Sequence, residues 1–262
     1  HINVFPTYEV YKKQFDIFVE SIVEGGSITY NSEDIDTNEI VNNTSRSIRK
    51  FQYSTPDFSI KNGLTYLHTN EGELPLEIFG KHNLSNLMGA KWICQQMGVD
   101  EDDFYQAITS FKGASNRLEK VFSNKNSHIY KDFAHSPSKV KATVNAVKNQ
   151  FEKHKVIACF ELHTFSSLNS EFINEYKDTL NRADTAIVYF SKATLESKKI
   201  QEIELKDIHS AFNKIDLLVF DDPLKLKEYL FSVNYNNSVL LMMSSGNFGN
   251  FNFNELQNIL LR

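Results

Sequence analysis

Apolar residues in the first part of the chain follow the spacing of a helix and then that of strands. From Tyr8 to Glu24 they recur at a helical period with one buried face, and Gly25-Gly26 ends the segment. Between residues 58 and 66 they alternate around Lys61-Asn62-Gly63, and an Asn-Gly pair between alternating runs predicts a β-hairpin. The same reasoning predicts a strand over Ser27–Tyr30, a short helix from Asn38, a solvent-facing stretch through Arg49 and Lys50, a third strand over Leu74–Phe79, and helices that contain Trp92 and Phe104.

After Lys112–Asn116 the pattern changes to a regular alternation of strands and helices, so we expect a domain boundary here. Strands that are apolar nearly throughout, separated by helices, are typical of an α/β fold with a doubly wound, mostly parallel sheet. Ligands bind such sheets at the carboxyl ends of the strands. The predicted strands are His128–Phe133, Lys155–Phe160, Asp184–Phe190, Asp216–Phe220 and Ser238–Met243, and the predicted helices are Ser138–Phe151, Glu171–Arg182, Leu205–Phe212, Leu224–Val233 and a last one from Asn254.

Composition narrows the class of protein. The 262 residues carry a net charge of −5 and are 41% hydrophobic, as in an ordinary globular protein. No apolar run approaches the ~20 residues of a membrane helix, and mild acidity speaks against nucleic-acid binding. Cys94 and Cys159 lie far apart in apolar segments. We therefore expect buried thiols in a cytoplasmic protein, with neither membrane nor nucleic acid as a partner.

Two predicted strands are each followed by an acid and an imidazole. Asp132 and His135 follow one strand, and Glu161 and His163 follow the next. Near a helix N-terminus such groups form an anion-binding corner. The alternative is an ordinary helix start, capped by Ser136. The segment 244–249 (SSGNFG) either lets backbone approach a ligand or is a plain turn.

A further group of polar residues precedes the helix that contains Trp92. His82 and Asn86 are four residues apart and share one helix face. Together with Asn83 they offer donors and acceptors to the edge of a planar ring, whereas Asn83 alone is equally consistent with a helix cap. His128, His154 and His209 have the pattern of ordinary solvent-facing residues.

Several motifs are absent from the sequence. It contains no G-x-x-x-x-G-K-[ST] phosphate loop, and no G-x-G-x-x-G follows a strand. A G-x-S-x-G elbow and a C-x-x-C pair are also missing. These absences exclude a P-loop within this chain, a typical dinucleotide domain, an α/β-hydrolase elbow and a thioredoxin-like redox motif.

Four segments, in order along the chain, resemble the Mur ligases, the ATP-dependent amide ligases of peptidoglycan synthesis. GKHNLSN (residues 80–86) is similar to their G-x-H-N-x-x-N segment, and FKGASNRLEKV (111–121) is similar to their linker into the C-terminal domain. DFAHSP (132–137) and FELHTFSS (160–167) resemble their D-[YF]-A-H-x-P and F-x-x-H-T-[FY]-S segments. The FKG triplet and SSGNFG favour the murein peptide ligase branch, with UDP-N-acetylmuramate–L-alanine ligase as the alternative.

The resemblance implies a domain organisation. Residues 1–114 would be the C-terminal half of the central ATPase domain, and residues 115–262 the C-terminal Rossmann-like domain. Because the chain begins with His1 and lacks a P-loop, we expect it to start midway through the central domain and to be inactive alone. We also expect its exposed sheet edge to be covered in a homodimer or to be mobile.

The resemblance also implies an activity. The whole enzyme would join UDP-N-acetylmuramate, through an acyl phosphate made with ATP and Mg²⁺, to L-alanyl-γ-D-glutamyl-meso-diaminopimelate in peptidoglycan recycling, or to L-alanine. Other readings are a noncatalytic nucleotide- or partner-binding module and a folylpolyglutamate-synthetase-like ligase. By resemblance, His1 helps hold magnesium, His82, Asn83 and Asn86 contact adenine, Arg117 contacts the phosphates, Asp132 contacts the ribose, and His135 and His163 are catalytic residues facing the reacting end of the substrate.

Overall fold

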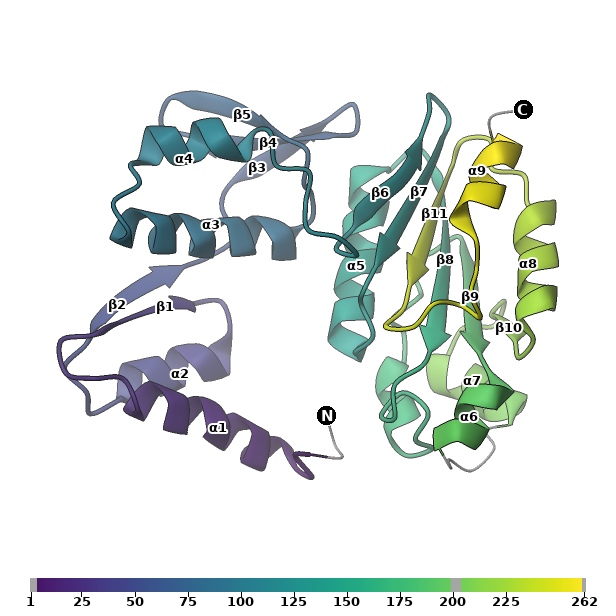
Figure 1. The fold of residues 1–262 in the computed structure, drawn as a ribbon, viewed down its shortest axis with the longest axis horizontal. Helices are drawn as coiled ribbons and strands as arrows, with labels where there is room; N and C mark the ends of the chain where they lie inside the picture. The colour runs from purple at the N-terminus through teal and green to yellow at the C-terminus, as the bar shows by residue number, and fades with distance from the viewer. Residues whose placement is uncertain (1–3, 199–203, 261–262) are drawn as a thin grey trace. The chain divides into compact units, whose positions relative to one another are not determined.

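The structure, a computed structural model, describes residues 4–198 and 204–260 (Figure 1). The chain divides into two units, His1–Phe111 and Lys112–Arg262, which are described separately below.

Unit 1 begins with a βαβ arrangement next to a helix. Helix α1 (Tyr8–Glu20) precedes strand β1 (Ser27–Asn31), helix α2 (Ile35–Asn43) and strand β2 (Arg49–Tyr53), and the two strands pair in parallel. Arg49 and Lys50 face solvent as expected, but they belong to strand β2, which was not predicted. Helix α2 begins before the expected Asn38, since the Asp34 carboxylate accepts a hydrogen bond from the N–H of Thr37 at 2.8 Å and caps the helix.

The rest of unit 1 is an antiparallel sheet with two helices. Strands β3 (Phe58–Lys61), β4 (Leu64–Thr69) and β5 (Gly72–Leu76) pair in that order, and helices α3 (Lys81–Gln96) and α4 (Glu101–Ile108) follow. The predicted hairpin is confirmed: Asn62 and Gly63 have φ values of 52° and 76°, as a tight hairpin turn requires. Side chains from the sheet and both helices form the core of this part, namely Leu67, Leu76, Ile78, Leu84, Leu87 and Phe104.

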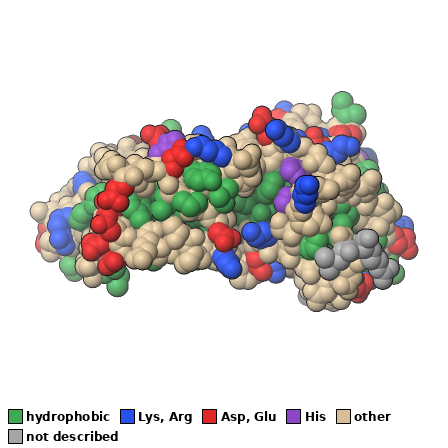
Figure 2. All heavy atoms as spheres, turned by 90° about the horizontal axis from the view of Figure 1, so that it is seen from above, with side chains coloured by type: hydrophobic (Ala, Val, Ile, Leu, Met, Phe, Trp, Pro, Cys, Tyr) green, Lys and Arg blue, Asp and Glu red, His purple; other side chains and the backbone are tan. Residues whose placement is uncertain are grey.

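Acidic side chains gather on the surface of unit 1 (red in Figure 2), where the first turn of α4 contributes Glu101, Asp102 and Asp103. The Asp100 carboxylate caps this helix by accepting a hydrogen bond from the N–H of Asp103 at 2.9 Å. Negative charge at a helix N-terminus complements the helix dipole, so this cluster stabilises α4.

Unit 2 is built on a six-stranded sheet in the order β10-β9-β8-β11-β7-β6. Its strands are β6 (Glu119–Ser123), β7 (Ser127–Asp132), β8 (Lys155–Leu162), β9 (Thr185–Phe190), β10 (Leu218–Phe220) and β11 (Ser238–Met243). All neighbouring pairs are parallel except β6 with β7. The predicted α/β fold class with a doubly wound, mostly parallel sheet is therefore confirmed, whereas the antiparallel edge strand β6 was not predicted.

Helices cover both faces of this sheet (Figure 1). They are α5 (Pro137–Gln150), the 3₁₀ helix η1 (Phe172–Tyr176), α6 (Lys192–Lys198), α7 (Leu205–Phe212), α8 (Pro223–Ser232) and α9 (Phe253–Leu260). On one face Cys159 and Leu240 pack with Leu226 of α8 and Leu256 of α9. On the other, the rings of Phe160 and Tyr176 lie 5.1 Å apart. Cys159 is fully buried as expected, and burial raises the pKa of its thiol, whereas Cys94 is only partly buried, contrary to expectation.

One predicted helix in unit 2 is wrong. Instead of a helix over Glu171–Arg182, the structure has the short η1 followed by turns, because Asp178 takes a left-handed φ of 62° that interrupts a helix. Helix α6 was not predicted. The histidine interpretation is partly wrong as well: His209 is exposed, but His128 packs on Phe151 at 4.7 Å and on His154 at 5.3 Å between ring centroids.

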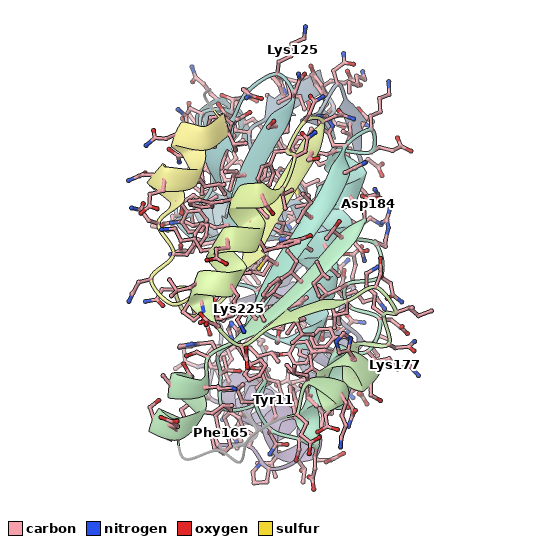
Figure 3. All side chains as sticks on the ribbon, turned by 90° about the vertical axis from the view of Figure 1, so that its right-hand side faces the viewer. Tyr11, Lys125, Phe165, Lys177, Asp184 and Lys225 are labelled. Carbon is pink, nitrogen blue, oxygen red and sulfur yellow. The ribbon has the colours of Figure 1, made fainter. Side chains whose placement is uncertain are left out.

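The parallel strands bring their carboxyl ends to one edge of the sheet. Asp184, which precedes β9, and Phe165, which follows β8, lie toward opposite ends of the sheet (Figure 3). The segments after β7, β8 and β11 therefore meet at the same edge, where sequence reasoning placed the chemistry. Among the described residues, no helix combines the length and hydropathy needed to cross a membrane.

Candidate functional site

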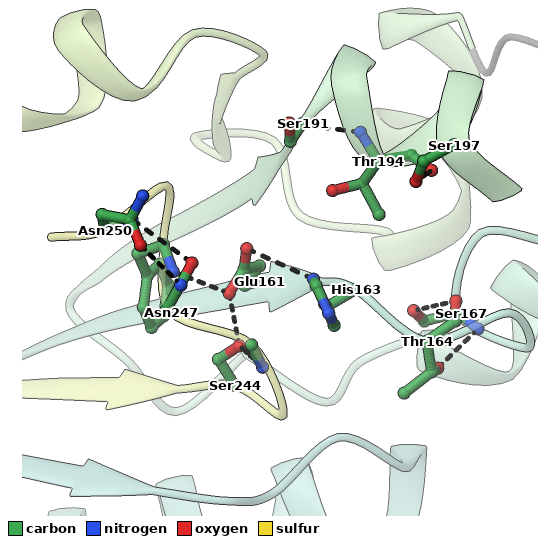
Figure 4. Close-up of polar contacts among 12 residues, drawn as sticks. Glu161, His163, Thr164, Ser167, Ser191, Thr194, Ser197, Ser244, Asn247 and Asn250 are labelled. Carbon is green, nitrogen blue, oxygen red and sulfur yellow. Dashed lines mark hydrogen bonds and ion pairs between the residues drawn. The ribbon is translucent and has the colours of Figure 1, made fainter.

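A buried carboxylate organises the carboxyl edge of the sheet in unit 2 (Figure 4). Glu161 in β8 is only 2% exposed, and it accepts hydrogen bonds from the hydroxyl of Ser244 and, at 3.0 Å, from the N–H of Phe248. Ser244 also accepts the N–H of Gly246 at 2.6 Å. An unpaired buried charge would be costly, so the hydrogen bonds from Ser244 and Phe248 compensate Glu161. Glu161 thereby fixes the segment 244–249 against β8.

His163 lies beside this carboxylate. Its Nδ1 is 3.7 Å from Glu161 Oε1, and about a third of its side chain is exposed. Gly246 makes the approach possible, because a Cβ at Gly246 would lie 2.6 Å from His163 Nδ1 and 2.8 Å from Glu161 Oε2. A side chain at Gly246 would therefore clash with the imidazole of His163, which explains the glycine in SSGNFG.

Asp132, at the end of the neighbouring strand β7, is already hydrogen-bonded within the protein. The residue is 7% exposed. Its Oδ2 accepts the N–H of Leu118 at 2.7 Å, and its Oδ1 accepts the N–H of Ala134 at 2.7 Å and the hydroxyl of Thr143 at 3.4 Å. The backbone oxygen of Asp132 accepts the N–H of Ser244 at 3.0 Å. This last bond joins the surroundings of Asp132 to those of Glu161.

Arg117 sits in the turn that Asp132 holds. Asn116 and Leu118, on either side of it, have left-handed φ values of 56° and 45°. Such values are uncommon outside glycine and unusual for a leucine. Arg117 itself is exposed, and within residues 4–198 and 204–260 no carboxylate forms an ion pair with it. The arrangement presents a free guanidinium, a group well suited to phosphate.

His135 follows β7 and is partly exposed. Its Nδ1 lies 2.9 Å from the carbonyl oxygen of Phe133, which can only accept, so Nδ1 carries the hydrogen and Nε2 of the neutral ring keeps the lone pair. The carbonyl of His135 accepts a hydrogen bond from the hydroxyl of Tyr176. These two contacts fix the segment and leave Nε2 available as an acceptor.

The polar residues before Trp92 lie in unit 1, on the first turns of α3. The N-cap is Gly80, with φ 90°, so the interpretation of Asn83 as the cap is wrong. Asn83 instead donates from Nδ2 to the carbonyl of Phe79 at 3.0 Å. His82 and Asn86 share one face, His82 half-buried and Asn86 exposed. Asn86 therefore offers its amide to a ligand, while Asn83 is bound to the local backbone.

The predicted site residues thus fall into separate groups. Asp132 lies beside the backbone of the Arg117 turn, and a hydrogen bond connects it to the segment held by Glu161. His82, Asn83 and Asn86 form their own group in unit 1, and His1 lies outside the described residues. The prediction omitted Ser244 and Leu118 as organising residues. A signal for Ser244 existed, since it directly follows a predicted strand; none existed for Leu118, whose importance lies in its backbone.

The expected magnesium ligand, His1, lies outside the described residues. Across residues 4–198 and 204–260, no group of three or more His, Cys, Asp or Glu side chains is arranged to hold a metal ion.

Comparison with known proteins gives a consistent result, although no protein-family model matches the chain. UDP-N-acetylmuramate–L-alanine ligase of Caldicellulosiruptor bescii is 31% identical over 200 residues, covering 72% of this chain and 44% of the relative. The ligase of the same name from Caldicellulosiruptor saccharolyticus is 28% identical over 260 residues, covering 94% and 56%. The chain spans about half the length of these curated relatives.

Solved structures share the fold. The UDP-N-acetylmuramate-alanine ligase of Thermotoga maritima aligns with a TM-score of 0.68 and 17% identity over all of this chain and 56% of its own. A murein peptide ligase from Psychrobacter arcticus aligns with a TM-score of 0.63 and 16% identity over 95% and 54%. The MurF ligase of Thermotoga maritima, solved in complex with ADP, gives 0.67 and 16% over 98% and 57%.

The sequence relatives and the shared fold together support the Mur ligase family for this chain. Both sequence relatives described above are UDP-N-acetylmuramate–L-alanine ligases, whereas the murein peptide ligase appears as a structural neighbour. The family expected from the motifs is thus supported, and the murein peptide ligase branch is not confirmed.

Proposed function

We propose that this chain is part of an ATP-dependent ligase that acts on UDP-N-acetylmuramate. In this ligase the chain would contact the bound nucleotide and bind the incoming amine. The observation that carries the proposal is the match to the UDP-N-acetylmuramate–L-alanine ligase of Caldicellulosiruptor saccharolyticus over 94% of the chain. The ligase would convert the carboxylate into an acyl phosphate, which an amine then attacks. Catalysis of such a reaction rests on positioning and on neutralising the phosphoryl charge.

The residues of this chain fit distinct parts of that task. Arg117 is exposed and free of an ion pair among the described residues, and we assign it to the ATP phosphates. Asn86 offers an exposed amide, and with His82 and Asn83 we assign it to adenine. His135 keeps Nε2 as an acceptor, and His163 stands next to a buried carboxylate. We assign these two histidines to the end of the site where the amine enters and loses a proton.

The identity of the amine donor is a separate proposal. We propose L-alanine, because both sequence relatives described above carry that activity in their names. The second candidate is L-alanyl-γ-D-glutamyl-meso-diaminopimelate. It is favoured by the FKG triplet, by SSGNFG and by a murein peptide ligase among the structural neighbours.

We further propose that the chain alone performs no ligation. Its sequence contains no P-loop, and positioning of the triphosphate depends on such a loop. We propose that the nucleotide is ATP and that it binds together with Mg²⁺. By resemblance, His1 is a candidate magnesium ligand. We also propose that the chain forms a homodimer.

A chimera tests the proposed function. The part of the Caldicellulosiruptor saccharolyticus ligase that precedes the matched region is joined to this chain, and ADP release is measured with UDP-N-acetylmuramate and either donor. We expect turnover in the chimera, none in the isolated chain, and losses of at least a hundredfold in Arg117→Ala. Faster turnover with the tripeptide than with L-alanine would reverse the donor assignment. Sustained turnover by the isolated chain would contradict its proposed dependence on a P-loop.

A further inference from the structure

We propose that Asp132 is a positioning residue, which holds the backbone of the linker turn 116–118 in a left-handed conformation and thereby aims Arg117. This inference rests on the proposed function, because the phosphate role of Arg117 belongs to it. It differs from the role that the family resemblance implies for Asp132, which is contact with a ribose.

The turn cannot be held by its own conformational preference. Leucine at φ 45° brings its Cβ too close to its carbonyl oxygen, and an asparagine at φ 56° lies two residues before it. Strained backbone of this kind persists only where the surroundings fix it. The strain lies at Leu118, directly after Arg117, so whatever fixes Leu118 also fixes the backbone next to Arg117.

Asp132 supplies the central contact. Its Oδ2 accepts the Leu118 N–H at 2.7 Å, in a buried environment where a charged acceptor forms a strong hydrogen bond. The side chain of Leu118 is itself buried, at 6% exposure. Leu118 is therefore held at its amide and at its side chain, and its left-handed conformation follows from both.

Asn116 is fixed from a second direction. The Glu119 carboxylate accepts the Asn116 N–H at 2.7 Å and the Ser115 hydroxyl at 3.1 Å. The carbonyl of Asn116 accepts the N–H of Phe133, the residue after Asp132, at 2.7 Å. The turn is thus bound to the end of β7 on both sides of Arg117, while Arg117 itself remains exposed.

The carboxylate of Asp132 is largely committed to this task. Both oxygens accept backbone N–H groups, one from Leu118 and one from Ala134, and the side chain is nearly inaccessible. A ligand hydroxyl would reach it only by sharing acceptors already in use. Arg117, by contrast, has no ion-pair partner in the described part of the chain. In this geometry Asp132 positions Arg117 through hydrogen bonds to the backbone of the turn.

The first test measures amide hydrogen exchange by NMR on the chain itself. We expect the Leu118 amide to exchange at least tenfold more slowly than an unprotected amide. Asp132→Asn should speed its exchange by about tenfold to a hundredfold, as expected for loss of a hydrogen bond to a charged group. The matched control is Thr143→Val, which removes the 3.4 Å contact to the same carboxylate and should leave Leu118 unchanged. An unprotected Leu118 amide in the wild type, or unchanged exchange in Asp132→Asn, would overturn the proposal.

The second test asks whether Arg117 follows Leu118. We expect Asp132→Asn to lower the backbone order parameter of Arg117 and to weaken the binding of tripolyphosphate by tenfold or more. Because tripolyphosphate has no ribose, loss of a ribose contact could not explain the weaker binding. Arg117→Ala should abolish that binding. Faster exchange at Leu118 with an unaltered Arg117 order parameter and unaltered tripolyphosphate affinity would overturn positioning. No response of wild-type Arg117 to tripolyphosphate would contradict its proposed phosphate role, while the exchange and order data would still decide the role of Asp132.

A variant at the partly exposed Glu119 keeps the proposal open to refutation if Asp132→Asn does not fold. Glu119→Gln should speed exchange at Asn116 while leaving Leu118 protected, because the two amides have different acceptors. Equal acceleration at both amides would show that the turn is held as a whole by Glu119, and would overturn the role given to Asp132.

Discussion

The carboxylate of Glu161 accepts the backbone N–H of Phe248 at 3.0 Å, although 87 residues separate them in the sequence. Glu161→Ala would leave this N–H and the Ser244 hydroxyl without their acceptor in a buried environment. We expect a loss of about 2–3 kcal/mol in the free energy of unfolding, the usual cost of orphaned partners of a charged group. Urea unfolding followed by circular dichroism measures it.

The matched control for this prediction is Glu171→Ala, since Glu171 is exposed in the same unit and only its backbone groups form the hydrogen bonds observed there. We expect a change within about 0.5 kcal/mol, as for most surface substitutions. Equal effects of the two substitutions would show that Glu161 does not hold the segment 244–249.

Gly246→Ala should displace His163. The added Cβ would lie 2.6 Å from His163 Nδ1, which is closer than carbon and nitrogen approach without a bond. We expect a destabilisation of about 1–3 kcal/mol, the range found when atoms are added to a packed site. In the His163→Ala background the same substitution should cost clearly less, because one of the two clashing groups is gone. Additive effects of the two substitutions in thermal unfolding would contradict this explanation.

His128 makes the stability of unit 2 dependent on pH. Burial lowers its pKa to about 4, with smaller contributions from His154 and Lys120. An unfolded histidine has a pKa of about 6.5. Between this pH and about pH 4, His128 is therefore protonated in the unfolded chain but neutral in the folded chain. Stability attributable to His128 should be fully present above about pH 6.5 and lost as the pH falls to about 4. Burial also lowers the pKa of His154, which adds in the same direction.

His128→Phe tests this dependence because it keeps an aromatic ring next to Phe151. Since His128 is only half buried, we expect about 1 kcal/mol less loss between pH 7 and pH 4 in the variant than in the wild type. The comparison is made by urea unfolding at a series of pH values. His209→Gln, at an exposed position on α7, should behave as the wild type. Identical pH profiles for wild type and His128→Phe would refute the assignment to His128.

Strands and helices with a strong periodic pattern could be predicted, and those without one could not. The core strand β11 was placed at Ser238–Met243, as observed, because all its residues are buried and all after Ser238 are apolar. Strand β6 was missed because it is a short, partly exposed edge strand with a register shift between Lys120 and Phe122. Strand β2 was missed because its exposed Arg49 and Lys50 hide its parallel pairing with β1.

The candidate site shows the same division. Its place at the carboxyl edge of the sheet could be predicted for Glu161 and His163, because parallel strands end at one edge. The partners of Asp132 could not, since they depend on a left-handed Leu118 that no propensity favours. Gly246 likewise has the pattern of a plain turn residue until the imidazole of His163 is placed beside it. Contacts that join distant segments through backbone groups leave little trace in the sequence.

The exposed apolar side chains of helix α1 indicate that the chain self-associates. Its residues Tyr8 and Phe18 are 60% and 63% exposed, and a groove of about 340 Å³ lies beside Phe18, lined by α1, β1 and α2. Large exposed apolar patches mark interaction surfaces. We therefore expect the isolated chain to form dimers through this face, as measured by sedimentation equilibrium over a range of concentrations.

Phe18→Lys should weaken this association by at least tenfold, because it places a charge where an apolar side chain would be buried. The matched control is Leu224→Lys, since Leu224 in unit 2 is similarly exposed, at 67%, and lies outside the groove. It should leave the dissociation constant within about threefold of the wild type, because a lone exposed apolar side chain needs no partner. A chain that stays monomeric at all concentrations, or equal effects of the two substitutions, would exclude α1 as the contact surface.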